Sequence, residues 1–192
     1  RLYCGIGSGG SPGELQMLGI DTDNGSPRDR MAESIDLILQ LWENGLGDFK
    51  GRFYKMSKPD LGPMMGFHMY PYQKPHPPIS VGSTSAKSAT LALAGERGWW
   101  PMTGPFVHRS LIKENWGSVS GGAAKTGRIP SRNQWRIARE IYVAETSQKA
   151  RDDLLNGPIP RDFVEYWKPF LGGSNRLDMF KYGQDIPDEA LT

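Results

Sequence analysis

The chain has 192 residues, a formal net charge of +2, 38% hydrophobic residues and 23% charged residues. These values are ordinary for a folded domain and exclude a disordered chain, and the basic residues are too scattered to bind a phosphate backbone. No apolar run approaches the roughly 18 residues of a membrane helix, and a single cysteine allows no intrachain disulfide. We therefore expect a cytoplasmic protein that binds neither nucleic acid nor membrane.

The opening stretch, RLYCGIGSGG, has three glycines in the spacing of the dinucleotide-binding fingerprint: Gly5, Gly7 and Gly10. A strand predicted over residues 2–6 precedes the loop, as that fingerprint requires. Ser11, Pro12 and Glu14 then predict the N-cap, the first residue and the N3 acid of a short helix that runs to Leu18. However, residues 21–30, DTDNGSPRDR, predict a turn and a helix start where the fingerprint needs a second strand that ends in an acid. We therefore expect no tightly bound nicotinamide cofactor, and the glycines need another explanation.

A long helix and a hairpin follow. Ser and Pro at residues 26–27 predict the start of a helix that ends at Gly45. The residues DFKGRFY predict a small hairpin that turns at Lys50 and Gly51. Residues 59–78 contain six prolines and are expected to form an excursion loop.

Strand, loop and helix then recur along the chain. Residues 78–98, PISVGSTSAKSATLALAGERG, predict a strand that ends at Val81, a turn at Gly82, a loop rich in Ser and Thr, and an alanine-rich helix. Residues 99–106, WWPMTGPF, predict a second strand and loop before a helix from about Val107.

A last strand is expected over residues 137–144, followed by a helix that is capped by Thr146 or Ser147. Strands that alternate with helices predict an α/β fold with a parallel sheet, which is either an open doubly wound sheet or part of an eight-stranded barrel. In both architectures ligands bind at the carboxyl ends of the strands, so the loops that follow the predicted strands should share one face.

The loop after the strand that ends at Val81 carries the most specific chemistry. Thr84, Ser85 and Ser88 are predicted at or just inside the start of a helix, where unpaired N–H groups and the helix dipole favour a phosphate and hydroxyls add donors. The alternative is that Thr84 or Ser85 only caps the helix and that Ser88 is an exposed helical serine. The three histidines are widely separated, so we expect no metal site.

These segments, in this order and spacing, resemble the bacterial luciferase-like flavin monooxygenases, and most of all their limonene monooxygenase-like branch. The similarity is carried by CGIGSGGSPGELQMLGIDTDNGSPRDRMAESIDLILQLW, by FKGRFY and by KPHPPISVGSTSAKSATLALAGERG, and it extends over essentially the whole chain. It implies a (β/α)8 TIM barrel of which this chain covers roughly the second half, with at least three further β/α units encoded before Arg1. Residues 1–192 would form one partial domain, with an excursion loop at 59–78 and a C-terminal extension at 156–192.

The resemblance also implies a cofactor and a reaction. Members of the family use reduced FMN, supplied by a separate flavin reductase, to activate O2. In this interpretation the glycine segment lies against the flavin, because glycine permits a close approach, and the Ser/Thr segment binds the flavin phosphate. Some relatives have an arginine where Ser8 stands. The implied cofactor-binding residues are Gly7, Ser8, Gly9, Gly10, Thr84, Ser85 and Ser88.

An apolar pocket on the same face is expected to bind the substrate, a small terpene-like or hydrocarbon molecule. His68, Trp100 and Met102 are its candidate residues, since methionine and aromatic side chains suit apolar ligands. No catalytic residue is predicted from this chain. Two other functions stay open: a deazaflavin (F420)-dependent dehydrogenase or reductase of the same superfamily, and a non-catalytic flavin-binding remnant. Formation of a homo-oligomer is also left open.

Overall fold

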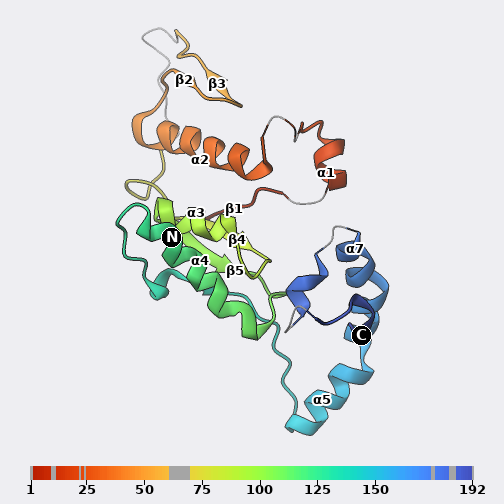
Figure 1. Cartoon of the computed structure of the whole chain (residues 1–192). Coiled ribbons are helices and arrows are strands. Elements are labelled where there is room, and N and C mark those ends of the chain that lie inside the picture. Colours follow the sequence, from red (N-terminus) through yellow and green to blue (C-terminus); the bar gives the residue numbers. More distant parts are fainter. Residues whose placement is uncertain are drawn as a thin grey trace. The chain divides into compact units, whose positions relative to one another are not determined.

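The computed structural model describes residues 2–9, 12–21, 23, 25–60, 70–173, 176–181 and 185–191. The chain divides into two compact units, Arg1–Ser80 and Val81–Thr192, and the division falls inside strand β4 (Ile79–Ser83). Figure 1 shows the elements of each unit, coloured from red at the N-terminus to blue at the C-terminus.

The first unit contains a short strand, two helices and a hairpin, so the predicted order of elements is confirmed. The strand begins at Cys4 rather than at Leu2, and the Cys4 N–H donates to Pro78 O at 2.9 Å. Ser11, the expected cap of the first helix, lies outside the described residues. The elements are β1 (Cys4–Ile6), α1 (Pro12–Met17), α2 (Pro27–Asn44), β2 (Phe49–Lys50) and β3 (Lys55–Met56).

Helix α2 has the boundaries that its sequence predicts. Ser26 is the N-cap, and its hydroxyl accepts the N–H of Asp29 while the Asp29 carboxylate accepts the N–H of Ser26, which completes a capping box. Gly45 ends the helix with a φ of 76°, a value that glycine adopts readily. Met31 and Ile35, two apolar residues of this helix, are buried.

The hairpin is antiparallel and is fixed to α2 by one carboxylate. Glu33 accepts the backbone N–H groups of Arg52, Phe53 and Tyr54, each at 2.8 Å. The turn therefore spans residues 51–54, with the Gly51 N–H on Tyr54 O at 2.9 Å, rather than being centred on Lys50 and Gly51. Burial raises the pKa of Glu33, but the three N–H donors and the Arg52 charge outweigh it and lower that pKa below its ordinary value.

The second unit continues the alternation of strands and helices. The sheet has the strand order β1-β4-β5-β6, and β5 and β6 are parallel. Its further elements are α3 (Ala89–Arg97), β5 (Trp100–Thr103), α4 (Ile112–Ala124), β6 (Arg136–Ile137), α5 (Ser147–Asn156), α6 (Pro158–Asp162) and α7 (Lys168–Gly172). Shorter turns are 3-10 helices at Arg109–Leu111, Arg132–Gln134, Leu177–Phe180 and Asp188–Ala190, and a π-helical turn at Phe163–Trp167.

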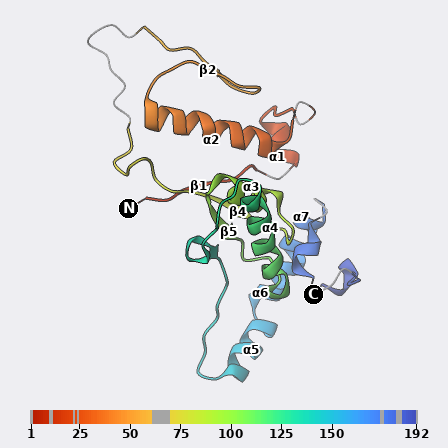
Figure 2. The same ribbon diagram turned by 60° about the vertical axis from the view of Figure 1, so that its left-hand side comes forward.

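Helices α3 and α4 lie side by side, as Figure 1 and the rotated view of Figure 2 both show. A Cβ on Gly95 of α3 would overlap Val119 O, and a Cβ on Gly122 of α4 would overlap Ala92 O. Each glycine thus lets the backbone of the other helix approach closely. This close contact fixes α4 against α3.

Two predicted boundaries in this unit are wrong. β4 runs to Ser83 rather than ending at Val81, because the Ser83 carbonyl still accepts an N–H from the loop after β5. Gly82 therefore lies within the strand instead of turning the chain. α4 begins at Ile112, after a 3-10 turn, rather than at about Val107.

The strand predicted over residues 137–144 is wrong in extent. β6 contains only Arg136–Ile137, and the N–H of Ala138 still donates to Thr103 O at 2.9 Å. β5 ends at Thr103, so no neighbouring strand among the described residues continues the hydrogen-bonded ladder. Residues 138–146 run on without regular secondary structure.

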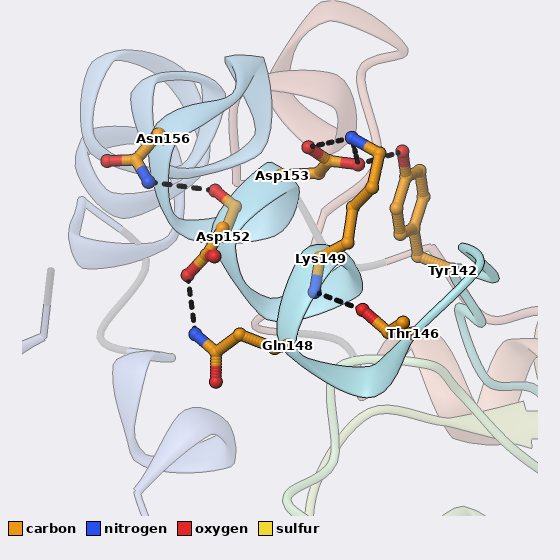
Figure 3. A network of polar contacts seen from close by, with 7 residues as sticks. All are labelled: Tyr142, Thr146, Gln148, Lys149, Asp152, Asp153 and Asn156. Carbon is orange, nitrogen blue, oxygen red and sulfur yellow. Dashed lines mark hydrogen bonds and ion pairs between the residues drawn. The ribbon is translucent and has the colours of Figure 1, made fainter.

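Polar side chains tie this segment to α5 instead, as Figure 3 shows. Thr146 caps the helix, as predicted, by accepting the Lys149 N–H at 3.1 Å. Tyr142 Oη donates to Asp153 at 3.0 Å, and Lys149 Nζ donates to the same carboxylate at 3.1 Å. The Lys149 and Tyr142 hydrogen bonds lower the pKa of Asp153, and the hydrogen bond to Asp153 raises the pKa of Tyr142. The positive charge of Lys149 and the negative charge of Asp153 are therefore paired with each other.

Residues near the C-terminus form an apolar cluster against the loop after β5. The His108 N–H donates to Met179 O at 2.8 Å, which joins that loop to the cluster. Lys181 lies beside the carboxylates of Asp188 (2.6 Å) and Asp178 (3.0 Å), and these hydrogen bonds raise its pKa. The buried members are Leu171, Leu177 and Met179, with Phe106, Trp167, Phe180 and Leu191 packed against them. None of the helices in the described part of the chain is long and apolar enough to cross a membrane.

Candidate functional site

The Ser/Thr loop, residues 84–88, connects β4 to α3. Ser88 is the N-cap of α3: its hydroxyl accepts the Leu91 N–H at 3.1 Å, and the residue is only 5% exposed. Its own N–H donates to Ser118 Oγ at 3.2 Å. The prediction that Thr84 and Ser85 stand at or inside the helix start is wrong, because both lie in the loop before Ser88.

This loop presents donors to its surroundings. Ser85 is exposed, and its hydroxyl lies 3.2 Å from Ser83 Oγ. Lys87 is also exposed and adds a positive charge. Within the described residues, the backbone N–H groups of Ala86 and Lys87 have no hydrogen-bond acceptor. Hydroxyls, open N–H groups and a cation on one loop are the donors that a phosphate requires.

Asn115 of α4 contacts the loop from within the unit and is fully buried. Its Nδ2 donates to the carbonyls of Ser85, at 2.7 Å, and of Ala86. Its Oδ1 accepts from Thr103 Oγ1 at 2.9 Å, and Trp135 Nε1 donates to that hydroxyl, also at 2.9 Å. Sequence reasoning missed Asn115, although an amide on the buried face of a predicted helix is a usable signal.

The loops that follow β4, β5 and β6 meet at one edge of the second unit. The Gly104 N–H, after β5, donates to Ser83 O at 2.9 Å, and a Cβ on Gly104 would lie 3.3 Å from Thr84 Cγ2. Arg139, after β6, donates from Nη1 to Pro105 O at 2.8 Å. The loops after Val81 and Met102, two of the three that are expected to share one face, therefore lie together in this unit.

Two predicted substrate-pocket residues lie on one face of β5. Trp100 and Met102 alternate with the buried Pro101 and Thr103, and Met102 is 39% exposed. Thr103 contacts α4 through Asn115, so Trp100 and Met102 belong to the face that α4 leaves uncovered. His68, the third predicted pocket residue, lies outside the described residues.

Two residues of the glycine loop (residues 7–9), Gly7 and Ser8, line a cavity within the first unit. Gly9 has a φ of 70°, a conformation that favours glycine, and Gly10 lies outside the described residues. The cavity has a volume of about 170 Å³. Its lining includes Gly7 and the polar residues Ser8, Arg30 and Ser34. Leu15, Ile20 and Met31 supply apolar lining.

Arg30 is a second residue that sequence reasoning missed. Its Nη2 donates to Asp21 O at 2.9 Å, and its guanidinium lies 4.5 Å from the centre of the Phe53 ring. Within the described residues, Arg30 Nε is buried and has no hydrogen-bond partner. A buried guanidinium donor with spare capacity fits an anionic or carbonyl-bearing ligand in this cavity.

No group of three or more His, Cys, Asp and Glu side chains in the described ranges could hold a metal ion. His76 is engaged within its own loop region, with Nδ1 2.7 Å from Pro77 O and Nε2 3.4 Å from Glu43. Its ring also stacks on Trp42. The absence of a metal stays a prediction.

Comparison with known proteins identifies the family. Residues 1–190 match the family of luciferase-like monooxygenases. The chain is 26% identical to 3,6-diketocamphane 1,6-monooxygenase of Pseudomonas putida, over 93% of this chain and 52% of that protein. It is 29% identical to limonene 1,2-monooxygenase of Rhodococcus erythropolis, over 82% of this chain and 38% of that protein. An F420-dependent hydroxymycolic acid dehydrogenase of Mycobacterium tuberculosis is 26% identical over 79% of this chain and 39% of its own length.

The fold agrees with that family. The structure of the oxygenating constituent of 3,6-diketocamphane monooxygenase from Pseudomonas putida, solved in complex with FMN, superimposes with a TM-score of 0.78 and 23% identity. The alignment covers 98% of this chain and 53% of that one. The chain belongs to the luciferase-like monooxygenase family, and its predicted α/β fold is confirmed. It spans about half the length of 3,6-diketocamphane 1,6-monooxygenase.

Proposed function

We propose that this chain is part of a flavin-dependent monooxygenase that uses reduced FMN and O2 to oxygenate a small apolar substrate. The observation that carries the proposal is the Ser/Thr loop: Asn115 occupies its carbonyls at Ser85 and Ala86, while within the described residues the N–H groups of Ala86 and Lys87 have no hydrogen-bond acceptor. Among relatives, 3,6-diketocamphane 1,6-monooxygenase and limonene 1,2-monooxygenase support the same reaction class.

The flavin phosphate is assigned to the Ser/Thr loop. Thr84 and Ser85 would donate from their hydroxyls, and Lys87 would add charge. The oxygen of Ser88 is already used as an acceptor by Leu91, but its hydroxyl hydrogen is not consumed by that bond. These residues fit an FMN phosphate because each hydroxyl and the Lys87 ammonium can donate a hydrogen bond to a phosphate oxygen.

The glycine loop is assigned to the rest of the flavin. Gly7, Ser8, Gly9 and Gly10 carry no side chain larger than a hydroxymethyl group, and a Cβ on Gly7 would meet nothing within 4 Å. This leaves room for a planar ring near the backbone. Arg30 Nε would offer a donor in the adjoining cavity.

The substrate is assigned to the face of β5 that carries Trp100 and Met102, with His68 from the excursion loop as a further contact. An apolar face orients a terpene-like molecule and excludes water from the reacting atoms. When bound, reduced flavin supplies the electrons that activate O2. Because no dinucleotide fingerprint accompanies the glycine loop, a separate flavin reductase is proposed to deliver the reduced flavin.

The test is an isotope experiment on the full-length protein. The protein is mixed with an apolar terpene-like substrate, NADH and labelled O2, first alone and then with FMN and a flavin reductase. We expect product only after both are added, and its new oxygen atom should carry the label. A product labelled from water instead would contradict the proposal.

A second candidate is hydride transfer with a deazaflavin. It is favoured by the similarity to the F420-dependent hydroxymycolic acid dehydrogenase. Under this alternative, the same protein would turn over without O2 when given the deazaflavin cofactor and would form no oxygenated product with reduced FMN and O2. Product analysis by mass spectrometry with each cofactor in turn, in air and without O2, distinguishes the two reactions.

A further inference from the structure

Asn115 uses both donors and one of the two acceptor positions of its amide. Its two Nδ2 hydrogens go to Ser85 O and Ala86 O, and its Oδ1 accepts from Thr103 Oγ1. The side chain is 0% exposed, so water cannot replace any of these partners. An amide in this state specifies one arrangement of the backbone that it contacts.

The direction of these bonds matters for the loop. A carbonyl oxygen that faced a bound phosphate would repel it, whereas a backbone N–H would attract it. By drawing the carbonyls of Ser85 and Ala86 toward α4, Asn115 turns the electronegative side of these peptides away from the open side of the loop. The loop is thereby organised for an anion before any ligand arrives.

Two further hydrogen bonds hold Asn115 and the loop in place. Trp135 Nε1 donates to Thr103 Oγ1, which leaves the Thr103 hydroxyl hydrogen for Asn115. One turn further along α4, Ser118 Oγ accepts the Ser88 N–H. Helix α4 therefore contacts the middle of the loop, at Ser85 and Ala86, and the end of the loop, at Ser88.

We propose that Asn115 is a positioning residue that holds the Ser/Thr loop in its phosphate-binding conformation, so that it sets the preference of the protein for a phosphorylated flavin. The inference rests on the proposed function, because it assigns the flavin phosphate to this loop. Asn115 itself touches the loop backbone and not the ligand.

The experiment measures the dissociation constants of FMN and of riboflavin, which lacks only the phosphate, for the full-length protein. The Asn115→Asp substitution replaces the two N–H donors with a carboxylate, which cannot donate to the carbonyls of Ser85 and Ala86. We expect the FMN dissociation constant to rise about tenfold or more, while that of riboflavin stays within about twofold. Equal weakening of both ligands by a folded Asn115→Asp protein would overturn the proposal.

A matched control comes from the other end of the same two helices. Thr126 Oγ1, just beyond α4, donates to Glu96 O of α3 at 3.1 Å. Thr126→Ala removes a polar contact between these helices without touching the loop. It is expected to leave the ratio of the two dissociation constants unchanged.

If Asn115→Asp does not fold, a milder variant tests the positioning role of Asn115. Thr103→Val keeps the side-chain volume but removes the donor to Asn115 Oδ1, and it should reduce the preference for FMN about two- to fivefold. An unchanged preference there would overturn the positioning role. A wild-type protein that binds riboflavin as tightly as FMN would instead contradict the phosphate assignment in the proposed function.

Discussion

One side chain of a neighbouring helix organises the backbone of a loop in each unit of this protein, but the two side chains have opposite polarity. In the first unit, the Glu33 carboxylate accepts three N–H groups from the hairpin turn. In the second unit, the Asn115 amide donates to two carbonyls of the Ser/Thr loop. The Glu33 contact occupies N–H donors of the hairpin turn, whereas the Asn115 contact occupies carbonyl acceptors of the Ser/Thr loop.

The difference explains why only one of the two loops is suited to bind an anion. The hairpin turn has spent its N–H groups on a carboxylate that already brings a negative charge, so a second anion would be repelled there. In the Ser/Thr loop the carbonyls of Ser85 and Ala86 are occupied, and no carboxylate among the described residues is bonded to the loop, so the N–H groups of Ala86 and Lys87 remain usable. The direction of the hydrogen bonds, rather than the presence of a turn or of hydroxyls, distinguishes the hairpin turn from the candidate phosphate-binding loop.

The largest expected effect comes from moving the helix that carries Asn115. Gly122→Ala would place a Cβ against Ala92 O, so α3 and α4 must separate. We expect a loss of about 3 kcal/mol in the free energy of unfolding, measured by urea denaturation. Gly121→Ala is the matched control, because a Cβ there meets nothing within 4 Å, and it should stabilise the helix by roughly 0.5–1 kcal/mol. Equal effects of the two substitutions would contradict the close packing of these helices.

Removing a hydroxyl from the open side of the Ser/Thr loop should weaken phosphate binding. Ser85→Ala is expected to raise the FMN dissociation constant about tenfold, or about 1.4 kcal/mol, because a hydrogen bond to a charged group is lost. Flavin titration followed by Trp fluorescence measures this change, and riboflavin binding serves as the control. Unchanged FMN affinity would remove Ser85 from the site.

Ser88→Ala separates the capping role of this residue from its assignment to phosphate. Ser88 is the N-cap of α3, so its loss should cost about 1 kcal/mol in the free energy of unfolding. Ser85→Ala should not change that quantity, since Ser85 caps no helix. Urea denaturation of both variants tests the distinction, and equal stability of Ser88→Ala and wild type would speak against the cap.

The smallest expected effect is the acid dependence of the hairpin contact, because Glu33 is only half-buried. The pKa of Glu33 in the folded protein lies below its ordinary value of 4.5. Its contribution to stability should therefore be complete above pH 4.5 and be lost as the pH falls through the folded-state pKa. Unfolding midpoints from pH 7 down to pH 3 should show this loss in the wild type and less of it in Glu33→Gln. Parallel curves for the two proteins would contradict a charge-dependent contact.

The sequence by itself determined the elements whose ends are set by local interactions. The caps of α2 and α5, at Ser26 and Thr146, involve residues three positions apart along the chain, so the residue pattern was sufficient to place both helix starts. The alternation of strands and helices and the position of the hairpin were predictable for the same reason. The choice of the Ser/Thr loop as the candidate phosphate site also came from the sequence, as a hypothesis.

Only the tertiary structure decided where strands end and which side chains support the candidate site. β4 continues to Ser83 and β6 stops at Ile137 because a strand extends as far as its neighbour offers hydrogen-bonding partners, and neighbours are not adjacent in sequence. Asn115 reaches Ser85 across a separation of 30 positions, and Arg30 lines the cavity of the glycine loop although nothing in its helix distinguishes it from a surface arginine. These roles depend on packing, since burial is what makes an amide or a guanidinium satisfy particular partners instead of water.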